Sequence, residues 1–236
     1  MTIRTLGVIG AGTMGNGIAQ AAAQAGLDVV MQDIMPEAVE RGLAAIGTSL
    51  DRLIRKEKLD EAGKAAALAR IRSTTDVAAL KGADLVIEAA TERESVKAQV
   101  LRNVEAVVRP DAILATNTSS ISITRLAASL KDPSRFVGMH FFNPVPMMAL
   151  VEIISGLQTS QTTFDAVTGL AKTLGKGDIL RGFDSEEHIP WGMLSPTGLQ
   201  GGLCQDEDSR KSCFSLTFHG IRKVFFFENI HKMSNG

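Results

Sequence analysis

Apolar and polar positions along most of this chain follow two patterns, short apolar runs and longer amphipathic segments. The short runs predict buried strands over residues 4–10, 27–33, 83–89, 112–116, 135–142 and 150–154. Helical spacing of apolar positions predicts helices over residues 12–25, 36–58, 60–70, 94–108, 123–130 and 160–174. A nearly pure apolar run is typical of a strand that helices cover on both faces. The alternation therefore predicts an α/β fold, with a doubly wound, mostly parallel sheet and flanking helices.

A glycine pattern marks the turn between the first expected strand and the first expected helix. Gly10, Gly12 and Gly15 stand at this turn, and the second apolar run ends at Asp33. Gly10 permits a tight turn, Gly12 lets the backbone approach a pyrophosphate, and Gly15 lets the helix pack close to the sheet. The pattern indicates a Rossmann-like dinucleotide-binding unit, with phosphates at the helix N-terminus and Asp33 on a ribose. A glycine turn without a ligand is the alternative.

Composition excludes several other classes of protein. The chain has 236 residues and a formal net charge of −1, which gives no electrostatic case for a nucleic-acid or membrane partner. Glycines and amides interrupt the uncharged stretch 5–27, and it lacks the marks of a membrane span or a secretory signal. Cys204 and Cys213 form no C-x-x-C pair. We therefore expect a cytoplasmic protein.

The sequence changes character after Gly175-Lys176. Residues 177–236 contain both cysteines, the only tryptophan and three of the four histidines, without a helical apolar period. We expect residues 1–176 to form the folded domain and 177–236 to be a divergent tail, irregular or disordered. A small irregular domain is the alternative. No metal site is expected, because the tail's possible ligands fit no common zinc spacing; they are His188, Cys204, Cys213, His219 and His231.

Polar side chains that could take part in catalysis fall at the expected carboxyl ends of strands, where such sheets bind ligands. They are Ser119, His140 and Asn143. Glu152 lies within the next apolar run, where a carboxylate is costly unless it is paired. The loop between the two runs is long enough to bring Glu152 beside His140, and such a pair would fix the imidazole tautomer and raise its basicity. The alternatives are a core histidine and a solvent-facing glutamate.

Three segments resemble the NAD-dependent 3-hydroxyacyl-CoA dehydrogenases. They are Gly7-Val-Ile-Gly-Ala-Gly-Thr-Met-Gly-Asn-Gly-Ile-Ala-Gln20, Asn117-Thr-Ser-Ser-Ile-Ser-Ile-Thr124, and His140-Phe-Phe-Asn-Pro-Val-Pro146 with Leu150-Val-Glu-Ile-Ile154. The third segment is the most specific. The similarity covers residues 3–176 and is strongest to the short-chain 3-hydroxybutyryl-CoA dehydrogenases.

This resemblance implies an oxidoreductase that moves hydride between NAD and C3 of a short-chain 3-hydroxyacyl-CoA. The reaction would convert 3-hydroxybutyryl-CoA to acetoacetyl-CoA, as in fatty-acid breakdown or butyrate metabolism. His140 would be the acid and base, Glu152 would orient it, and Ser119 and Asn143 would bind the reacting oxygen or the nicotinamide.

The resemblance also implies the ligand contacts. Ser49 and Lys56 would help to hold coenzyme A. Asp33 would favour NAD over NADP, since no arginine follows it. The cofactor contacts would be Gly10, Gly12, Thr13, Met14, Gly15, Asp33, Glu92, Lys97, Ser119 and Asn143.

The chain departs from the family after residue 176. The family's C-terminal helical domain, which closes the acyl cleft and forms most of the homodimer interface, is not recognisable. An open cleft and uncovered apolar surface would follow, with weak or absent turnover, poor solubility and retained NAD binding. Two alternatives remain open, a non-catalytic NAD-binding remnant and a superfamily relative that acts on a sugar acid or 3-hydroxy acid.

Overall fold

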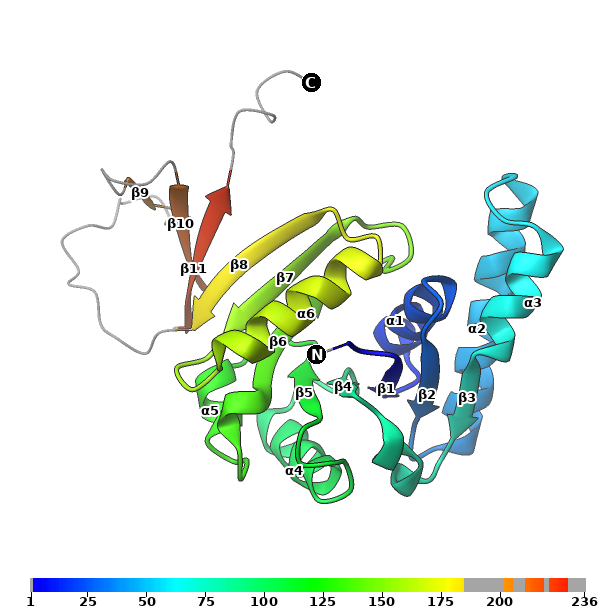
Figure 1. Ribbon diagram of the computed structural model, residues 1–236, viewed down its shortest axis with the longest axis horizontal. Helices are drawn as coiled ribbons and strands as arrows, with labels where there is room; N and C mark the ends of the chain where they lie inside the picture. The colour runs from blue at the N-terminus through cyan, green and yellow to red at the C-terminus, as the bar shows by residue number, and fades with distance from the viewer. Residues whose placement is uncertain (1, 185–201, 206–210, 219–220, 229–236) are drawn as a thin grey trace.

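The computed structural model describes residues 2–184, 202–205, 211–218 and 221–228 (Figure 1). Its strands form one sheet in the order β3-β2-β1-β4-β5-β6-β7-β8-β11-β10-β9. The strands up to residue 184 are β1 (Thr5–Ile9), β2 (Asp28–Gln32), β3 (Ile71–Thr74), β4 (Leu85–Glu88), β5 (Ile113–Thr116), β6 (Phe136–Phe141), β7 (Leu150–Ser155) and β8 (Asp178–Asp184). The helices are α1 (Thr13–Gln24), α2 (Pro36–Arg55), α3 (Glu61–Ala69), α4 (Glu94–Glu105), α5 (Ile123–Ala127) and α6 (Gln161–Thr173), with short 3-10 segments η1 (Val77–Gly82) and η2 (Pro133–Arg135).

The sheet is mostly parallel. Strands β3, β2, β1, β4, β5 and β6 run parallel to their neighbours. Strand β7 returns antiparallel to β6, and β8 is parallel to β7. The order 3-2-1-4-5-6 is the Rossmann order, so the prediction of a doubly wound, Rossmann-like sheet is confirmed.

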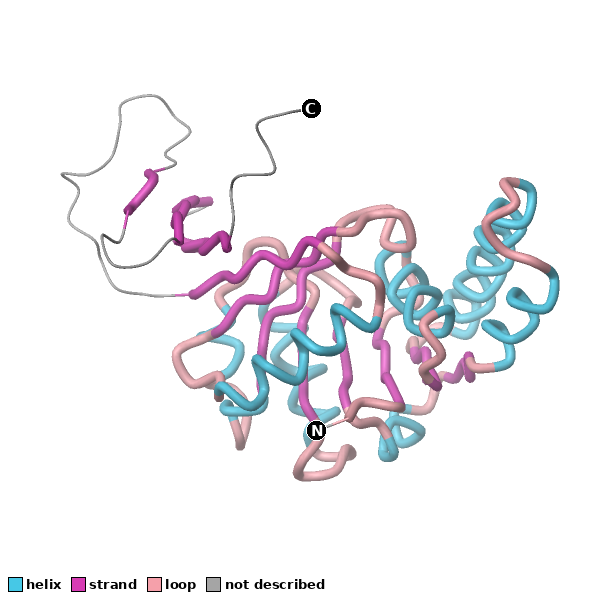
Figure 2. Tube along the Cα trace, turned by 45° about the horizontal axis from the view of Figure 1, so that its top comes forward, coloured by secondary structure: helices cyan, strands magenta, loops and turns pink. Residues whose placement is uncertain are grey.

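Helices bury both faces of the sheet, and Figure 2 shows the helices in layers beside the strands. In β4, Leu85 and Ile87 belong to one apolar cluster and Val86 to another, because successive side chains of a strand point to opposite faces. Helices α1 and α6 contribute to the first cluster, and α4 and α5 to the second. This double burial explains why the strands are almost purely apolar in sequence.

Sequence reasoning missed some elements and placed some ends too late. Strand β3, with the sequence Ile71-Arg-Ser-Thr74, lies at the edge of the sheet, so its side chains are half-buried or exposed and carry no apolar run. The helices expected over 94–108 and 123–130 end at Glu105 and Ala127.

Within residues 177–236, where the sequence predicts an irregular tail, the structure describes further strands. Strand β8 pairs with β7 and carries the sheet past residue 176. Strands β11 (Ile221–Glu228), β10 (Lys211–Phe218) and β9 (Gly202–Gln205) follow in antiparallel pairing. The division of the chain at residue 176 stays a prediction. The histidines considered as metal ligands, His188, His219 and His231, lie outside the described residues.

Among the described helices, none combines the length and the apolar character that crossing a membrane requires.

Candidate functional site

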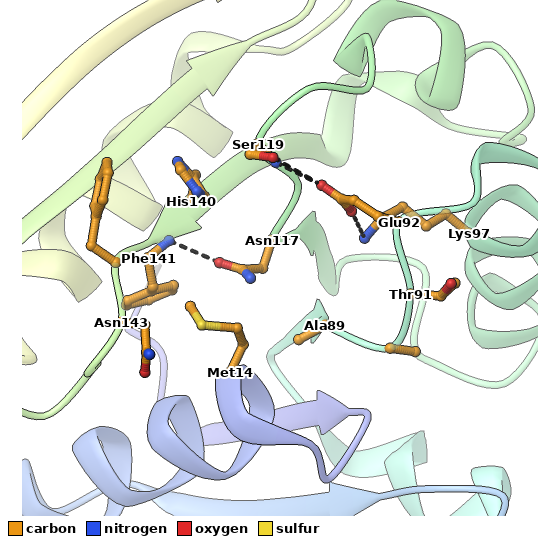
Figure 3. A pocket seen from close by; sticks show the side chains of 12 residues that line it. Met14, Ala89, Thr91, Glu92, Lys97, Asn117, Ser119, His140, Phe141 and Asn143 are labelled. Atoms are coloured by element: carbon orange, nitrogen blue, oxygen red, sulfur yellow. Dashed lines mark hydrogen bonds and ion pairs between the residues drawn. The ribbon is translucent and has the colours of Figure 1, made fainter.

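Adjoining cavities open at the carboxyl end of the parallel strands. The smaller has a volume of about 380 Å³ and the larger about 560 Å³, and both are lined by Ala90 and Thr91. The smaller cavity contains side chains from the ends of β5 and β6 and from the start of α1 (Figure 3). The larger one contains Gly10 and Asp33. Gly10, Asp33, Ser119, His140 and Asn143, which were predicted to bind cofactor or to act in catalysis, thus meet at one edge of the sheet, as expected for a doubly wound fold.

The three glycines of the β1–α1 turn lie in different surroundings. Gly10 has a φ of 94°, and a Cβ there would lie 2.7 Å from the Ala89 carbonyl oxygen. A Cβ on Gly15 would lie 1.7 Å from the Gly10 carbonyl oxygen, so this glycine lets α1 pack against the turn itself. Gly12 has ordinary backbone angles and nothing within 4 Å of a Cβ. No neighbour in the described structure requires a glycine at residue 12, which leaves its surface open to a ligand.

Asp33 ties the end of β2 to the glycine turn. Its Oδ2 accepts a hydrogen bond from the Ala11 N–H at 2.8 Å, and its Oδ1 accepts one from the Met35 N–H at 3.1 Å. Ile34 and Met35 beside it are exposed although apolar, at 82% and 53%. The larger cavity therefore combines a carboxylate with an apolar wall, the combination that a ribose and a flat base require.

His140 and Glu152 occupy paired positions of the antiparallel strands β6 and β7. Nδ1 of His140 lies 2.8 Å from Oε2 of Glu152, and the two side chains are 18% and 12% exposed. The Phe142 ring lies against the imidazole, with 4.6 Å between ring centroids. His140, Phe142 and Asn143 line the smaller cavity, and Met14 points toward it from α1 (Figure 3). Since Nδ1 is engaged by Glu152, Nε2 is the imidazole atom that is left for chemistry in this cavity.

Asn117 is a site residue to which the sequence analysis gave no role. It follows β5, lines the smaller cavity, and accepts a hydrogen bond on Oδ1 from the Phe141 N–H at 2.8 Å (Figure 3). This bond joins the ends of β5 and β6 next to His140. The signal was present, because an amide directly after a buried strand is unusual unless it has a partner.

Glu92 connects two other predicted residues, Ser119 and Lys97. Its Oε1 accepts from the Ser119 N–H at 2.9 Å and from the Thr118 hydroxyl at 2.8 Å, and Lys97 Nζ lies 3.3 Å from its Oε2. Burial raises the pKa of Glu92, but these hydrogen bonds and the Lys97 charge outweigh it and lower the pKa below its ordinary value. Glu92 is therefore an anion in the wall of the smaller cavity at neutral pH.

Lys97 is buried, at 1% exposure, in a network that sequence reasoning did not anticipate. Its Nζ donates to Glu88 Oε2 at 2.7 Å and to Thr116 Oγ1 at 3.3 Å. Glu88 is fully buried and also accepts from the Ala90 N–H. The position of Glu88 at the end of an apolar run was the available signal. Lys97 lines the cavity while its charge is compensated from within the fold.

Two predicted ligand contacts lie elsewhere. Ser49 and Lys56 are on or just after α2, which forms a hairpin with α3 at the far edge of the sheet (Figure 1). Neither lines the two cavities at the carboxyl edge. Their assignment to coenzyme A stays a prediction.

The fold and site define the cofactor-binding domain of a Rossmann-type dehydrogenase. The chain belongs to the family of 3-hydroxyacyl-CoA dehydrogenase NAD-binding domains, whose family model matches residues 5–182. It is 48% identical over 174 residues to the 3-hydroxybutyryl-CoA dehydrogenase of Bradyrhizobium diazoefficiens, covering 74% of this chain and 59% of that protein. The enzyme of the same name from Clostridioides difficile is 47% identical, with 72% and 61% coverage.

Solved structures agree with these relatives. The (S)-3-hydroxybutyryl-CoA dehydrogenase PaaH1 from Ralstonia eutropha is 58% identical with a TM-score of 0.76, covering 78% of this chain and 65% of that one. FadB2 of M. tuberculosis is 39% identical with the same TM-score and the same coverage. The chain spans about three fifths of the length of the curated relatives it matches.

NAD is the cofactor of this family, and the residues of this chain fit it. The N-terminus of α1 has no side-chain cap, so its first amides are not satisfied by a capping side chain. The open surface of Gly12 lies at the same turn, and Asp33 is at the neighbouring strand end. Amides, an unobstructed backbone and a carboxylate are what the pyrophosphate and ribose of a dinucleotide require.

Proposed function

We propose that this site interconverts a short-chain 3-hydroxyacyl-CoA and the corresponding 3-ketoacyl-CoA, with 3-hydroxybutyryl-CoA as the substrate of choice. The observation that carries the proposal is the His140–Glu152 pair, with Nδ1 2.8 Å from Oε2, in the wall of a cavity next to the dinucleotide turn. Bound NAD supplies the hydride acceptor, and NADH the donor. The names of the relatives support the acyl-CoA substrate.

The residues of the chain handle the proton. During oxidation, Nε2 of His140 takes the proton from the C3 hydroxyl, and the electron pair of the C3–H bond leaves with the hydride as the carbonyl forms. Glu152 accepts a hydrogen bond from Nδ1–H of His140. This hydrogen bond holds the tautomer with a basic Nε2 and stabilises the imidazolium that results. In the reverse direction, the imidazolium returns this proton to the ketone oxygen.

Ser119 and Asn143 supply further polar groups in the cavity that His140 lines. Both line the smaller cavity, Ser119 after β5 and Asn143 after β6. We assign them to the reacting oxygen or to the carboxamide end of the cofactor. The Asn143 amide can donate a hydrogen bond there, and the Ser119 hydroxyl, which donates to Glu92 Oε1 at 3.3 Å, can accept one. Glu92 fixes the backbone of Ser119 and so supports this assignment.

A second candidate function is NAD binding without turnover. The observation that favours it is coverage, because the relatives that carry the enzyme name are longer than the matched segment, which spans 59% to 61% of them. Cofactor binding would need only the glycine turn and Asp33, whereas turnover also needs the acyl chain to be held against His140.

The deciding experiment measures NADH oxidation by the full chain with acetoacetyl-CoA, together with NADH binding by fluorescence. We expect turnover in the wild type and its loss in His140→Ala, with an unchanged Kd for NADH. Equal turnover in the variant would overturn the role of His140. NADH binding without turnover in the wild type would select the second candidate. Acetoacetate without coenzyme A, as a parallel substrate, tests whether the thioester portion is needed.

A further inference from the structure

Lys176 is a buried cation that the proposed chemistry does not use. The residue is 3% exposed, and its Nζ donates to the carbonyl oxygens of Val145 at 2.6 Å and Met148 at 2.7 Å. Among the described residues, no carboxylate forms an ion pair with its ammonium group. Burial lowers the pKa of Lys176. A buried cation is costly unless it is hydrogen-bonded, so the two carbonyl groups are its compensation.

The acceptors of Lys176 belong to the β6–β7 loop, residues 142–149, which joins the strand of His140 to the strand of Glu152. The N–H groups of Met147 and Met148 donate to the Pro144 carbonyl, so the loop contains a tight turn. The carbonyl groups of Val145 and Met148 point to Lys176. The loop resembles one turn of helix whose carbonyl end is capped by a lysine.

The other side of the loop rests on the dinucleotide helix. A Cβ added to Gly17 of α1 would lie 3.0 Å from Val145 Cβ and 3.6 Å from Pro146 Cδ. The β6–β7 loop is therefore held between α1 and Lys176. This places Asn143, which lines the smaller cavity, on a segment fixed from two sides.

Helix α6 determines where Lys176 lies. At its end the Lys176 N–H donates to the Ala171 carbonyl and the Gly175 N–H to the Lys172 carbonyl, with Gly175 at a φ of 71°. This is the Schellman arrangement, in which a glycine in the left-handed region ends a helix. The lysine side chain thus leaves from a rigid helix end.

We propose that Lys176 is a positioning residue of the active site, which fixes the β6–β7 loop and with it Asn143 and the His140–Glu152 pair. Its effect on the order of the loop follows from the contacts alone, whereas its effect on turnover rests on the proposed function. Small displacements of reacting groups are costly, so loss of this cap lowers kcat by about 10-fold to 100-fold while cofactor binding is retained.

The test compares Lys176→Met and Lys176→Gln with Lys172→Met, which removes an exposed lysine from the same helix. Hydrogen exchange of residues 142–149 reports on the loop. We expect exchange at Met147 and Met148 to rise roughly tenfold or more in both Lys176 variants, with α6 and β1 unchanged. Lys172→Met should match the wild type. The Kd for NADH should stay within about threefold in all variants, because the glycine turn is untouched.

Unchanged loop exchange in the Lys176 variants would overturn the proposal. So would an increase spread equally over the whole domain, because Lys176 would then contribute only general stability. The glutamine variant keeps a polar group and decides the matter if the methionine variant does not fold. Absence of turnover in the wild type would count against the proposed function, and loop exchange would still decide the role of Lys176.

Discussion

His140 and Glu152 face each other across two antiparallel strands, and this register brings Nδ1 to 2.8 Å from Oε2. The contact is therefore set by the sheet, because a slip of one residue would turn one of the two side chains to the opposite face. The neighbouring bond from the Phe141 N–H to Asn117 ties the same strand to β5. In the proposed reaction, a pair held by strand pairing would need little rearrangement before it acts.

Glu152→Gln tests this pair. Glutamine keeps the size of the side chain and its acceptor oxygen, but it lacks the charge that stabilises the imidazolium. We expect kcat for acetoacetyl-CoA reduction to fall by about 10²-fold or more, in the range of general acid–base catalysis. The Kd for NADH should not change. Exposed Glu40→Gln is the matched control, and a wild-type kcat in Glu152→Gln would show that the carboxylate has no catalytic effect.

Two glycines of the β1–α1 turn should lose different amounts of stability when each is changed to alanine. In Gly15→Ala the added Cβ would collide with the Gly10 carbonyl oxygen, so we expect the free energy of unfolding to fall by about 1–3 kcal/mol. In Gly12→Ala the Cβ meets nothing within 4 Å, so the loss should stay below about 1 kcal/mol, as at an unfavourable N-cap.

Cofactor binding should separate the same variants. Gly12→Ala places a methyl group where the pyrophosphate approaches, and we expect its Kd for NADH to rise roughly tenfold, about 1.4 kcal/mol. Urea denaturation and NADH fluorescence measure the two effects. Unaltered NADH binding in Gly12→Ala would remove the reason given for this glycine.

The parts of the site that were predictable from sequence have local signatures. Gly10 is required by its φ of 94°, and Gly15 by its contact with the Gly10 carbonyl oxygen in the same turn. The apolar runs around His140 and Glu152 favoured a pair between the two side chains. The mostly parallel, doubly wound arrangement follows from the alternation of strands and helices. These features depend on neighbours in sequence or on a single hairpin.

Other parts could not be predicted because their partners are remote in sequence. Lys97 can donate a hydrogen bond to Thr116 only when α4 packs beside β5. Lys176 can donate to the β6–β7 loop only when α6 packs on the sheet. Edge strand β3 is half-buried and thus carries no apolar run. A burial pattern identifies a core position, but it does not identify the hydrogen-bond partner of a buried charge.

The buried ion pair between Lys97 and Glu88 should be costly to break from one side. Lys97→Met leaves the Glu88 carboxylate buried without its cation, and we expect the free energy of unfolding to fall by about 3–5 kcal/mol. Lys97→Met combined with Glu88→Gln should be less destabilised than Lys97→Met alone, because no fully buried carboxylate is then left without its cation. Urea denaturation measures both, with exposed Lys81→Met as the control. Equal losses in the single and double variants would contradict this account.

The carboxylate of Glu92 should make part of the stability of the domain depend on pH. Its pKa is raised by burial, but hydrogen bonds from Ser119 and Thr118 and the charge of Lys97 bring it below the ordinary value of 4.5. A carboxyl group whose pKa is lower in the folded state stabilises that state above its unfolded pKa. This contribution is lost as the pH falls through the folded pKa.

Glu92→Gln removes the charge while keeping an oxygen that can accept from Ser119. The variant should therefore unfold at a lower urea concentration than the wild type at pH 7, and this difference should shrink once the pH falls below 4.5. The effect should be modest because the Glu92 side chain is 46% exposed. Glu40→Gln, on an exposed face of α2, should show no such pH dependence. A difference that stays constant between pH 7 and the acid limit would mean that Glu92 stabilises the fold through packing and not through its charge.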